Sequence, residues 1–82
     1  MALTIEYNDR AAKDLRKMSP EVARRVVSKI NRLGDGLSTD VKRLTNFRPM
    51  YRLRVGDWRV LFDLEKDHIV VCRVCHRSEA YE

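Results

Sequence analysis

The second half of the chain alternates apolar and polar side chains with a period of two, the pattern of strands that bury one face. It predicts three strands, over residues 50–55, 58–65 and 68–74. Gly56 and Asp57 separate the first two strands, and a two-residue loop with glycine first is typical of a type II′ hairpin turn. Residues 2–7 alternate in the same way, so a fourth strand is expected near the N-terminus.

Between these regions the apolar spacing is helical. Asn8 or Asp9 can cap a first helix that reaches residue 18. Ser19 and Pro20 then start a second helix, with serine at the cap and proline at the first helical position, where its missing N–H is not needed. The second helix, over 19–34, has one apolar stripe, formed by Val22, Ala23, Val26, Val27, Ile30 and Leu33.

The order of these elements predicts an α+β fold, β-α-α-β-β-β. Two N-terminal helices pack on one face of a four-stranded, mainly antiparallel sheet, and the other face is open. Residues 37–49 show no period and are expected to form a loop. A length of 82 residues suits a single domain, 1–82. The apolar runs are too short for a membrane span, and no signal pattern opens the chain, so a cytoplasmic protein with reduced cysteines is expected.

The net charge of +5 is concentrated in one stretch. Residues 42–60 contain six basic side chains and one acidic side chain, whereas the rest of the chain has eleven of each. The six are Lys42, Arg43, Arg48, Arg52, Arg54 and Arg59. A basic surplus confined to one region favours a binding site for a polyanion such as a nucleic-acid backbone. A solvated basic face is the alternative.

The Gly56-Asp57 turn determines which side chains share a face. It places Arg54 directly across from Arg59, and it leaves one apolar face formed by Tyr51, Leu53, Val55, Trp58, Val60, Phe62 and Leu64. Arg52, Arg54 and Arg59 then share the opposite face. Like charges directly opposite in a sheet cost a few tenths to about 1 kcal/mol. Loss of either Arg54 or Arg59 is therefore expected to leave stability unchanged or slightly higher, and the pair favours a functional role.

The C-terminal residues add chemistry to this face. A three-residue second turn would place Arg73 and Cys75 beside Arg59, whereas a two-residue turn would point Arg73 into the core, so the longer turn is predicted. The tail contributes an imidazole, a guanidinium and a phenol, from His76, Arg77 and Tyr81. Such groups suit phosphodiester cleavage without a metal. Cys72 and Cys75 are expected on opposite faces of one strand, which does not suit a zinc site.

The run MYRLRVGDWRVLFDLEKDHIVVCRVCHRSEAY resembles the second half of the RelE/ParE toxin superfamily. The matching features are a Tyr-Arg-x-Arg strand, a Gly-Asp turn, an aromatic-Arg-Val strand and a closing His-Arg-x-x-x-Tyr. The first half of the chain fits by pattern alone. The resemblance to the RelE branch implies a metal-independent endoribonuclease without a cofactor, which cleaves mRNA on the ribosome. The 2′-hydroxyl attacks the adjacent phosphate and leaves a 2′,3′-cyclic phosphate.

The same resemblance implies roles for individual residues. Arg52 and Arg54 stand where well-known members carry lysines, one of which is implicated as a general base, and Arg59 matches a phosphate-binding arginine. Arg77 matches the arginine assigned to protonation of the leaving group or stabilisation of its charge, and Tyr81 the tyrosine near the scissile nucleotide. Arginine is a poor general base because its pKa exceeds about 12, so His76 is the better candidate base. The basic residues expected to bind the RNA backbone are Lys42, Arg43, Arg48 and Arg73.

Two alternatives share this fold: a ParE-like inhibitor of DNA gyrase, and a non-catalytic co-repressor that acts with its antitoxin. The closing His-Arg-x-x-x-Tyr favours the nuclease branch over the gyrase inhibitor. The expected partners are the ribosome, mRNA and an antitoxin whose acidic or amphipathic segment covers the arginines, with operator DNA contacted only through the antitoxin.

Overall fold

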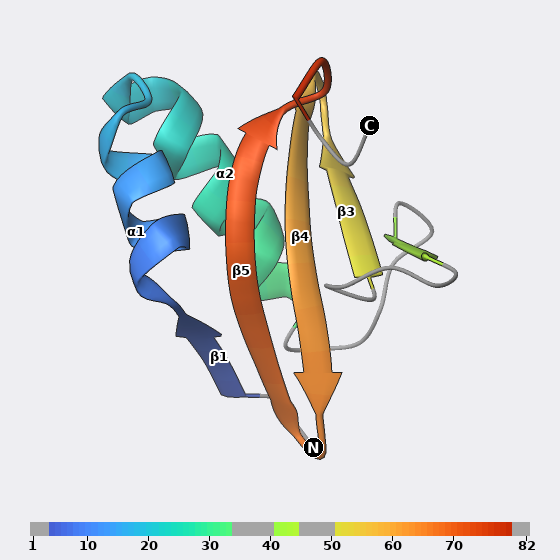
Figure 1. Cartoon of the computed structure of the whole chain (residues 1–82). Helices are drawn as coiled ribbons and strands as arrows, with labels where there is room; N and C mark the ends of the chain where they lie inside the picture. Colours follow the sequence, from blue (N-terminus) through green and yellow to red (C-terminus); the bar gives the residue numbers. More distant parts are fainter. Residues whose placement is uncertain (1–3, 34–40, 45–50, 80–82) are drawn as a thin grey trace.

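In the part of the chain that the structure describes, five strands form one sheet in the order β1-β5-β4-β3-β2, and two helices cover one of its faces (Figure 1). The computed structural model describes residues 4–33, 41–44 and 51–79. Its elements are β1 (Thr4–Tyr7), α1 (Asp9–Arg16), α2 (Pro20–Arg32), β2 (Val41–Arg43), β3 (Tyr51–Val55), β4 (Trp58–Glu65) and β5 (His68–His76). The α+β fold with both helices on one face is as predicted.

The strand count differs from the prediction of four, because Val41–Arg43 forms the edge strand β2 where a loop was expected. Three residues are too few for a period to be recognised in the sequence. β2 pairs antiparallel with β3, and Lys42 lies opposite Arg52. The remaining pairs are also antiparallel, except that β1 runs parallel to β5.

Both helices begin at the residues that the sequence indicated. The Asn8 side chain accepts a hydrogen bond from the Ala11 amide at 2.9 Å, and Ser19 accepts one from Val22 at 3.4 Å. Pro20 occupies the first turn of α2. Along the part of the chain that the structure describes, neither helix is long and apolar enough to cross a membrane.

The core lies between the helices and the sheet. Val26 and Ile30 of α2 and its C-cap residue Leu33 are each 1% exposed or less, and Ala11 of α1 is fully buried. The sheet contributes Leu53, Val55, Val60, Phe62, Ile69, Val71 and Val74. In Figure 1 α2 passes behind β5 and β4, so the face of the sheet towards the viewer is the open one.

The hairpin of β3 and β4 has the predicted register, with Val55 paired to Trp58, Arg54 to Arg59 and Leu53 to Val60. Gly56 has a φ of 59°, as the first position of a type II′ turn requires.

The second turn differs from the prediction, since Glu65 pairs with His68 and only two residues separate them. Arg73 nevertheless reaches the expected face, because the register of β4 and β5 shifts between Leu61 and Phe62. Phe62 pairs with Val71 and Leu61 with Arg73, so one extra residue of β5 is accommodated as an irregularity of the bulge type. The bulge performs the shift that a longer turn was expected to provide.

Candidate nucleic-acid interface on the open face of the sheet

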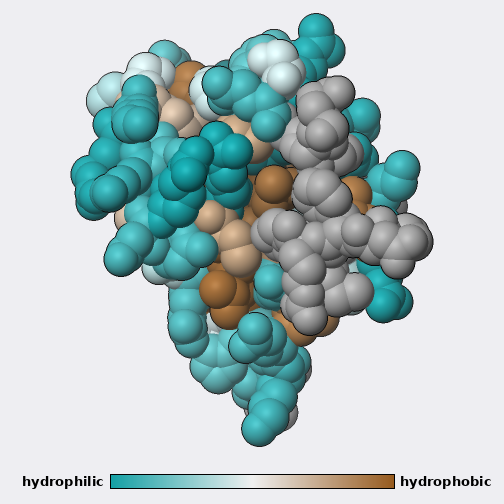
Figure 2. Space-filling model, viewed as in Figure 1, coloured by the Kyte–Doolittle hydropathy of each residue, from teal (hydrophilic) through white to brown (hydrophobic). Residues whose placement is uncertain are grey.

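The open face of the sheet gathers cations from four strands. Cross-strand partners point to the same side of a sheet, so the register of the strands assigns each side chain to a face. Arg54 lies opposite Arg59. We call the set the arginine face; its members are Lys42, Arg52, Arg54, Arg59 and Arg73. Figure 2 shows this side of the molecule, with hydrophilic surface beside a patch of apolar surface near its middle.

Arg54 and Arg59 lie directly opposite each other but differ in exposure. Arg54 is exposed, whereas Arg59 is partly buried. Nη1 of Arg59 donates to the carbonyl oxygens of Gly56 and Trp58, at 2.9 Å in each case. These bonds fold the Arg59 guanidinium back over the hairpin turn and restrict its position before any ligand binds. Arg59 therefore stabilises the hairpin turn in addition to contributing positive charge to the face.

Arg73 is held from the helical layer by Asp14 of α1. Its Nε lies 3.7 Å from Asp14 Oδ2, and the same oxygen accepts a hydrogen bond from the Val74 amide at 2.9 Å. The other carboxylate oxygen lies 3.5 Å from Nε of Arg10. β1 pairs with β5 only as far as Val71, so Asp14 supplies the hydrogen-bond acceptor for the Val74 amide. Its carboxylate also partly compensates the charge of Arg73. Nothing in the local sequence pattern indicated this contact.

The C-terminal turn is attached to the hairpin turn by Asp57. The Arg77 amide donates to the Asp57 carbonyl at 2.8 Å, and Arg77 Nε lies 4.0 Å from the Asp57 carboxylate. The structure therefore places Arg77 beside the turn that also holds Arg59. Both side chains of the exposed Arg77–Asp57 pair are more than half exposed, at 65% and 68%, so the pair itself adds little stability.

His76 does not lie on the arginine face. It pairs with Trp58, whose side chain packs against the core, and the two rings meet edge to face at 5.5 Å. Its Nδ1 lies 3.0 Å from the Ser78 hydroxyl and 3.3 Å from the Ser78 amide. The expectation that the imidazole joins the arginines is not met. The alternation itself was the missed signal, because a residue that directly follows Cys75 points to the other side.

The other predicted RNA-binding residues separate in the same way. Lys42 pairs with Arg52 and joins the arginine face, whereas Arg43 pairs with Tyr51 and belongs to the helix-facing side. Arg48 and Tyr81 lie outside the described residues.

The two cysteines are free thiols. Cys72 lies 3.8 Å from the carboxylate of Asp63, a residue of the open face, while Cys75 pairs with Arg59. They therefore do not lie on opposite faces as predicted. Burial raises the pKa of Cys72 above its ordinary value of 9.0, and Asp63 raises it further; burial also raises the pKa of Cys75. Both thiols are protonated at neutral pH. Within the described ranges, no group of three or more His, Cys, Asp or Glu side chains is placed to hold a metal ion.

Comparison with known proteins identifies the family. The sequence model of a family described as the ParE toxin of the type II toxin–antitoxin system, parDE, matches residues 5–81. The chain belongs to the RelE/ParE family of type II toxins. A curated relative, Toxin RelE3 of Methanocaldococcus jannaschii, is 32% identical over 76 residues, which cover 85% of either chain.

Solved structures of similar toxins share the fold. The toxin–antitoxin complex RelBE2 of Mycobacterium tuberculosis matches with a TM-score of 0.81 at 24% identity, over 94% of this chain and 100% of that one. The RelB–RelE complex of Methanococcus jannaschii matches with a TM-score of 0.75 at 25% identity, over 93% and 94%. An arginine-to-alanine double mutant of the E. coli toxin RelE matches with a TM-score of 0.80 at 16% identity, over 98% and 88%.

Proposed function

We propose that this toxin is a ribosome-dependent endoribonuclease that cleaves mRNA and thereby inhibits translation. Both the RelE and the ParE names occur among its relatives, so the choice of target rests on the site. The observation that carries the proposal is the pair of Arg54 and Arg59, which face each other on an open sheet surface. Two like charges at that spacing oppose folding, and a bound phosphate would offset their repulsion.

The chemistry of the site follows from its residues. In the proposed reaction, the 2′-oxygen gives its proton to solvent water and attacks the adjacent phosphorus. The bond from phosphorus to the 5′-oxygen then breaks, that oxygen takes a proton from solvent water, and the products are a 2′,3′-cyclic phosphate and a 5′-hydroxyl. Negative charge accumulates on the pentacoordinate phosphate. Guanidinium groups that are already held in place stabilise such charge without reorganising during the reaction.

The roles that we assign combine this geometry with the resemblance. Arg59, fixed by the turn, binds the phosphate, while Arg52 and Arg54 stabilise its developing charge. Arg77, beside the same turn, stabilises the leaving group. Tyr81 keeps the role that the resemblance implies, next to the scissile nucleotide.

His76 receives a positioning role in this proposal, in place of the general-base role expected from the sequence. Its ring lies on the helix-facing side, and its Nδ1 interacts with Ser78 in the turn that carries Arg77. The imidazole thereby orients the tail without contacting the substrate.

A cognate antitoxin is the proposed partner. Several structural relatives were solved as toxin–antitoxin complexes, including those of M. tuberculosis and M. jannaschii. An acidic or amphipathic segment of the antitoxin would cover the arginine face, and operator DNA would be contacted only through it. Binding to the folded toxin alone would raise its stability by mass action.

Inhibition of DNA gyrase is the second candidate function, because the matched family model carries the ParE description. The two candidates are separated by adding purified toxin to a translation extract and mapping mRNA 5′ ends by primer extension. A parallel reaction measures supercoiling by gyrase. The nuclease proposal expects new 5′ ends within translated codons and unchanged supercoiling. Intact mRNA with inhibited supercoiling would support the gyrase function instead, and a 3′ end that is a plain hydroxyl would contradict the 2′-hydroxyl mechanism.

A further inference from the structure

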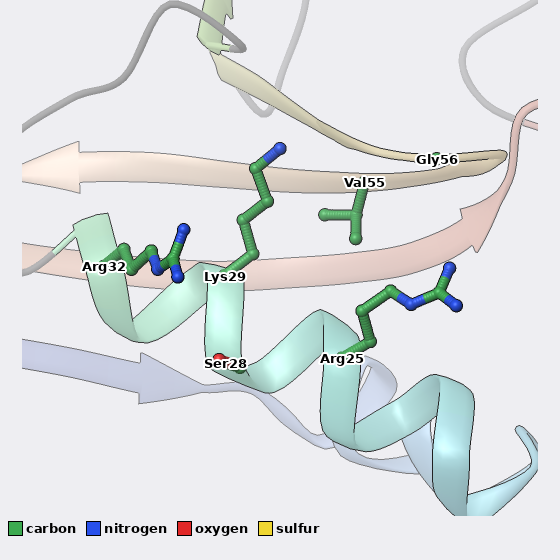
Figure 3. Close-up of a pocket in the computed structure, with 6 residues that line it drawn as sticks. All are labelled: Arg25, Ser28, Lys29, Arg32, Val55 and Gly56. Atoms are coloured by element: carbon green, nitrogen blue, oxygen red, sulfur yellow. The ribbon is translucent and has the colours of Figure 1, made fainter.

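A second basic surface lies on the helix-facing side of the molecule, between α2 and the β3–β4 hairpin. We call it the α2 groove; it has a volume of about 280 Å³ and is lined by Arg25, Ser28, Lys29, Arg32, Val55 and Gly56. Figure 3 shows Arg25 and Lys29 extending from the helix towards the hairpin, with Val55 pointing down between them. None of these cations belongs to the arginine face.

The cations of the groove are spaced regularly along the helix. Arg25, Lys29 and Arg32 stand at positions i, i+4 and i+7, so they share one side of α2 and are separated along its axis by about 6 Å and 4.5 Å. Glu21 is the acidic residue of α2, against four basic ones. Arg25 and Arg32 are exposed, and neither forms an ion pair with another described residue. Arg25 and Arg32 therefore leave two exposed positive charges on the side of α2 that lines the groove.

The groove and the arginine face meet at one turn. Gly56 lines the groove, and its carbonyl oxygen accepts the hydrogen bond from Arg59. Nη1 of Arg25 approaches the turn closely, since it lies 3.9 Å from the position that a Cβ of Gly56 would occupy. A polyanion that follows the surface around Gly56 would contact both sets of cations.

We propose that the α2 groove binds the sugar–phosphate backbone of RNA and anchors it apart from the cleavage site. Its lining favours this ligand over a protein segment. A docked peptide is held mainly by apolar anchors, and the apolar residue here, Val55, is only 3% exposed. Cations with an adjacent hydroxyl, Ser28, suit phosphate oxygens and sugar hydroxyls. This inference rests on the proposed function for its choice of RNA as the polyanion.

The test measures binding without cleavage. A fluorescein-labelled single-stranded RNA of about 20 nucleotides, 2′-O-methylated throughout, lacks the attacking hydroxyl and reports binding by anisotropy at several salt concentrations. The double variant Arg25→Gln/Arg32→Gln should bind about tenfold more weakly, with the slope of log K against log salt reduced by about 1.4 for two lost contacts. The matched control, Arg16→Gln/Arg24→Gln, removes the same charge from exposed positions of α1 and α2 outside the groove and should bind nearly as wild type.

Two outcomes would overturn the inference. Equal losses in both double variants would mean that net charge alone sets the affinity. Wild-type RNA binding by the groove variant, together with weaker binding of a poly-glutamate peptide, would assign the groove to an acidic protein segment. The methylated RNA cannot be cleaved, so its binding is measured independently of nuclease activity. If the toxin binds this RNA through the groove but leaves mRNA intact in the translation extract, the groove proposal stands and the proposed function is wrong. Urea unfolding of each variant establishes that it is folded.

Discussion

Arg54 and Arg59 occupy directly opposite positions on β3 and β4, and the side chain of Arg59 is hydrogen-bonded to the turn that joins the two strands. The two guanidinium groups thus carry the same charge on the same face with different structural consequences. Repulsion between them is lost when either is removed, but the bonds to Gly56 and Trp58 are lost only with Arg59.

Stability should therefore respond differently to the two truncations. Arg54→Ala is expected to leave the free energy of unfolding unchanged or raised by at most about 1 kcal/mol. Arg59→Ala is expected to lower it by about 1–2 kcal/mol, because two carbonyl oxygens lose their donor. This revises the expectation from the sequence alone, which treated the two residues alike. Urea unfolding measures both values, and equal effects would contradict the bonded role of Arg59.

Asp14 should stabilise the fold through the amide of Val74. Asp14→Ala leaves that partly buried amide without its acceptor and is expected to cost about 1–3 kcal/mol. Asp14→Asn is the matched control, because its side-chain oxygen can still accept the hydrogen bond although the charge near Arg73 is lost. Thermal or urea unfolding should therefore show most of the loss in the alanine variant. Equal destabilisation by both substitutions would mean that the ion pairs, not the hydrogen bond, are what matters.

Alkaline pH should destabilise the toxin through its buried thiols. Burial raises the pKa of Cys72 and Cys75 above 9.0, and that of Tyr7 above 10.0. The folded state therefore favours the protonated forms, and this contribution is complete below the unfolded pKa values and is lost as pH rises through the folded ones. The urea midpoint should begin to fall at about pH 9 and should fall further as the pH rises above it. The variant Cys72→Ala/Cys75→Ala should show a shallower fall, and an identical pH dependence would contradict the cause assigned here.

Substitution of His76 distinguishes a positioning role from general-base catalysis. Asparagine can place an acceptor oxygen near the position of Nδ1, so His76→Asn should retain the interaction with Ser78 and cleave mRNA within a few-fold of the wild-type rate. A general base would instead contribute about 10²–10⁴-fold. Cleavage rates across pH check this. A loss of that size would restore His76 as the base.

Local rules predicted most of the sheet. The Gly56-Asp57 turn has two residues, and it therefore sets the register of β3 and β4 and, with alternation, the common face of Arg54 and Arg59. The same rules failed where the determinant was not local. The bulge at Leu61 and Phe62 depends on how β5 fits both its neighbours, so the sequence suggested a longer turn in its place.

The contacts that hold the site residues in place were the feature least predictable from the sequence. Asp14 contacts Val74 across 60 residues of sequence, and no periodicity connects a polar residue of a helix with one amide of a strand. The attachment of Arg77 to Asp57 was missed for a related reason, because it depends on where the chain turns after β5.

The most direct test of the central claim is the cleavage rate of ribosome-bound mRNA by Arg54→Gln. Wild-type toxin and the control Arg24→Gln, which removes an exposed arginine outside both basic surfaces, are measured in the same translation extract. If Arg54 stabilises the charge on the phosphate, the rate should fall about 10²–10³-fold, as when one preorganised oxyanion donor is removed. The control should cleave at the wild-type rate, and both variants should unfold at urea concentrations no lower than the wild type. Cleavage by folded Arg54→Gln at the wild-type rate would contradict the account and make the arginine face an ordinary charged surface.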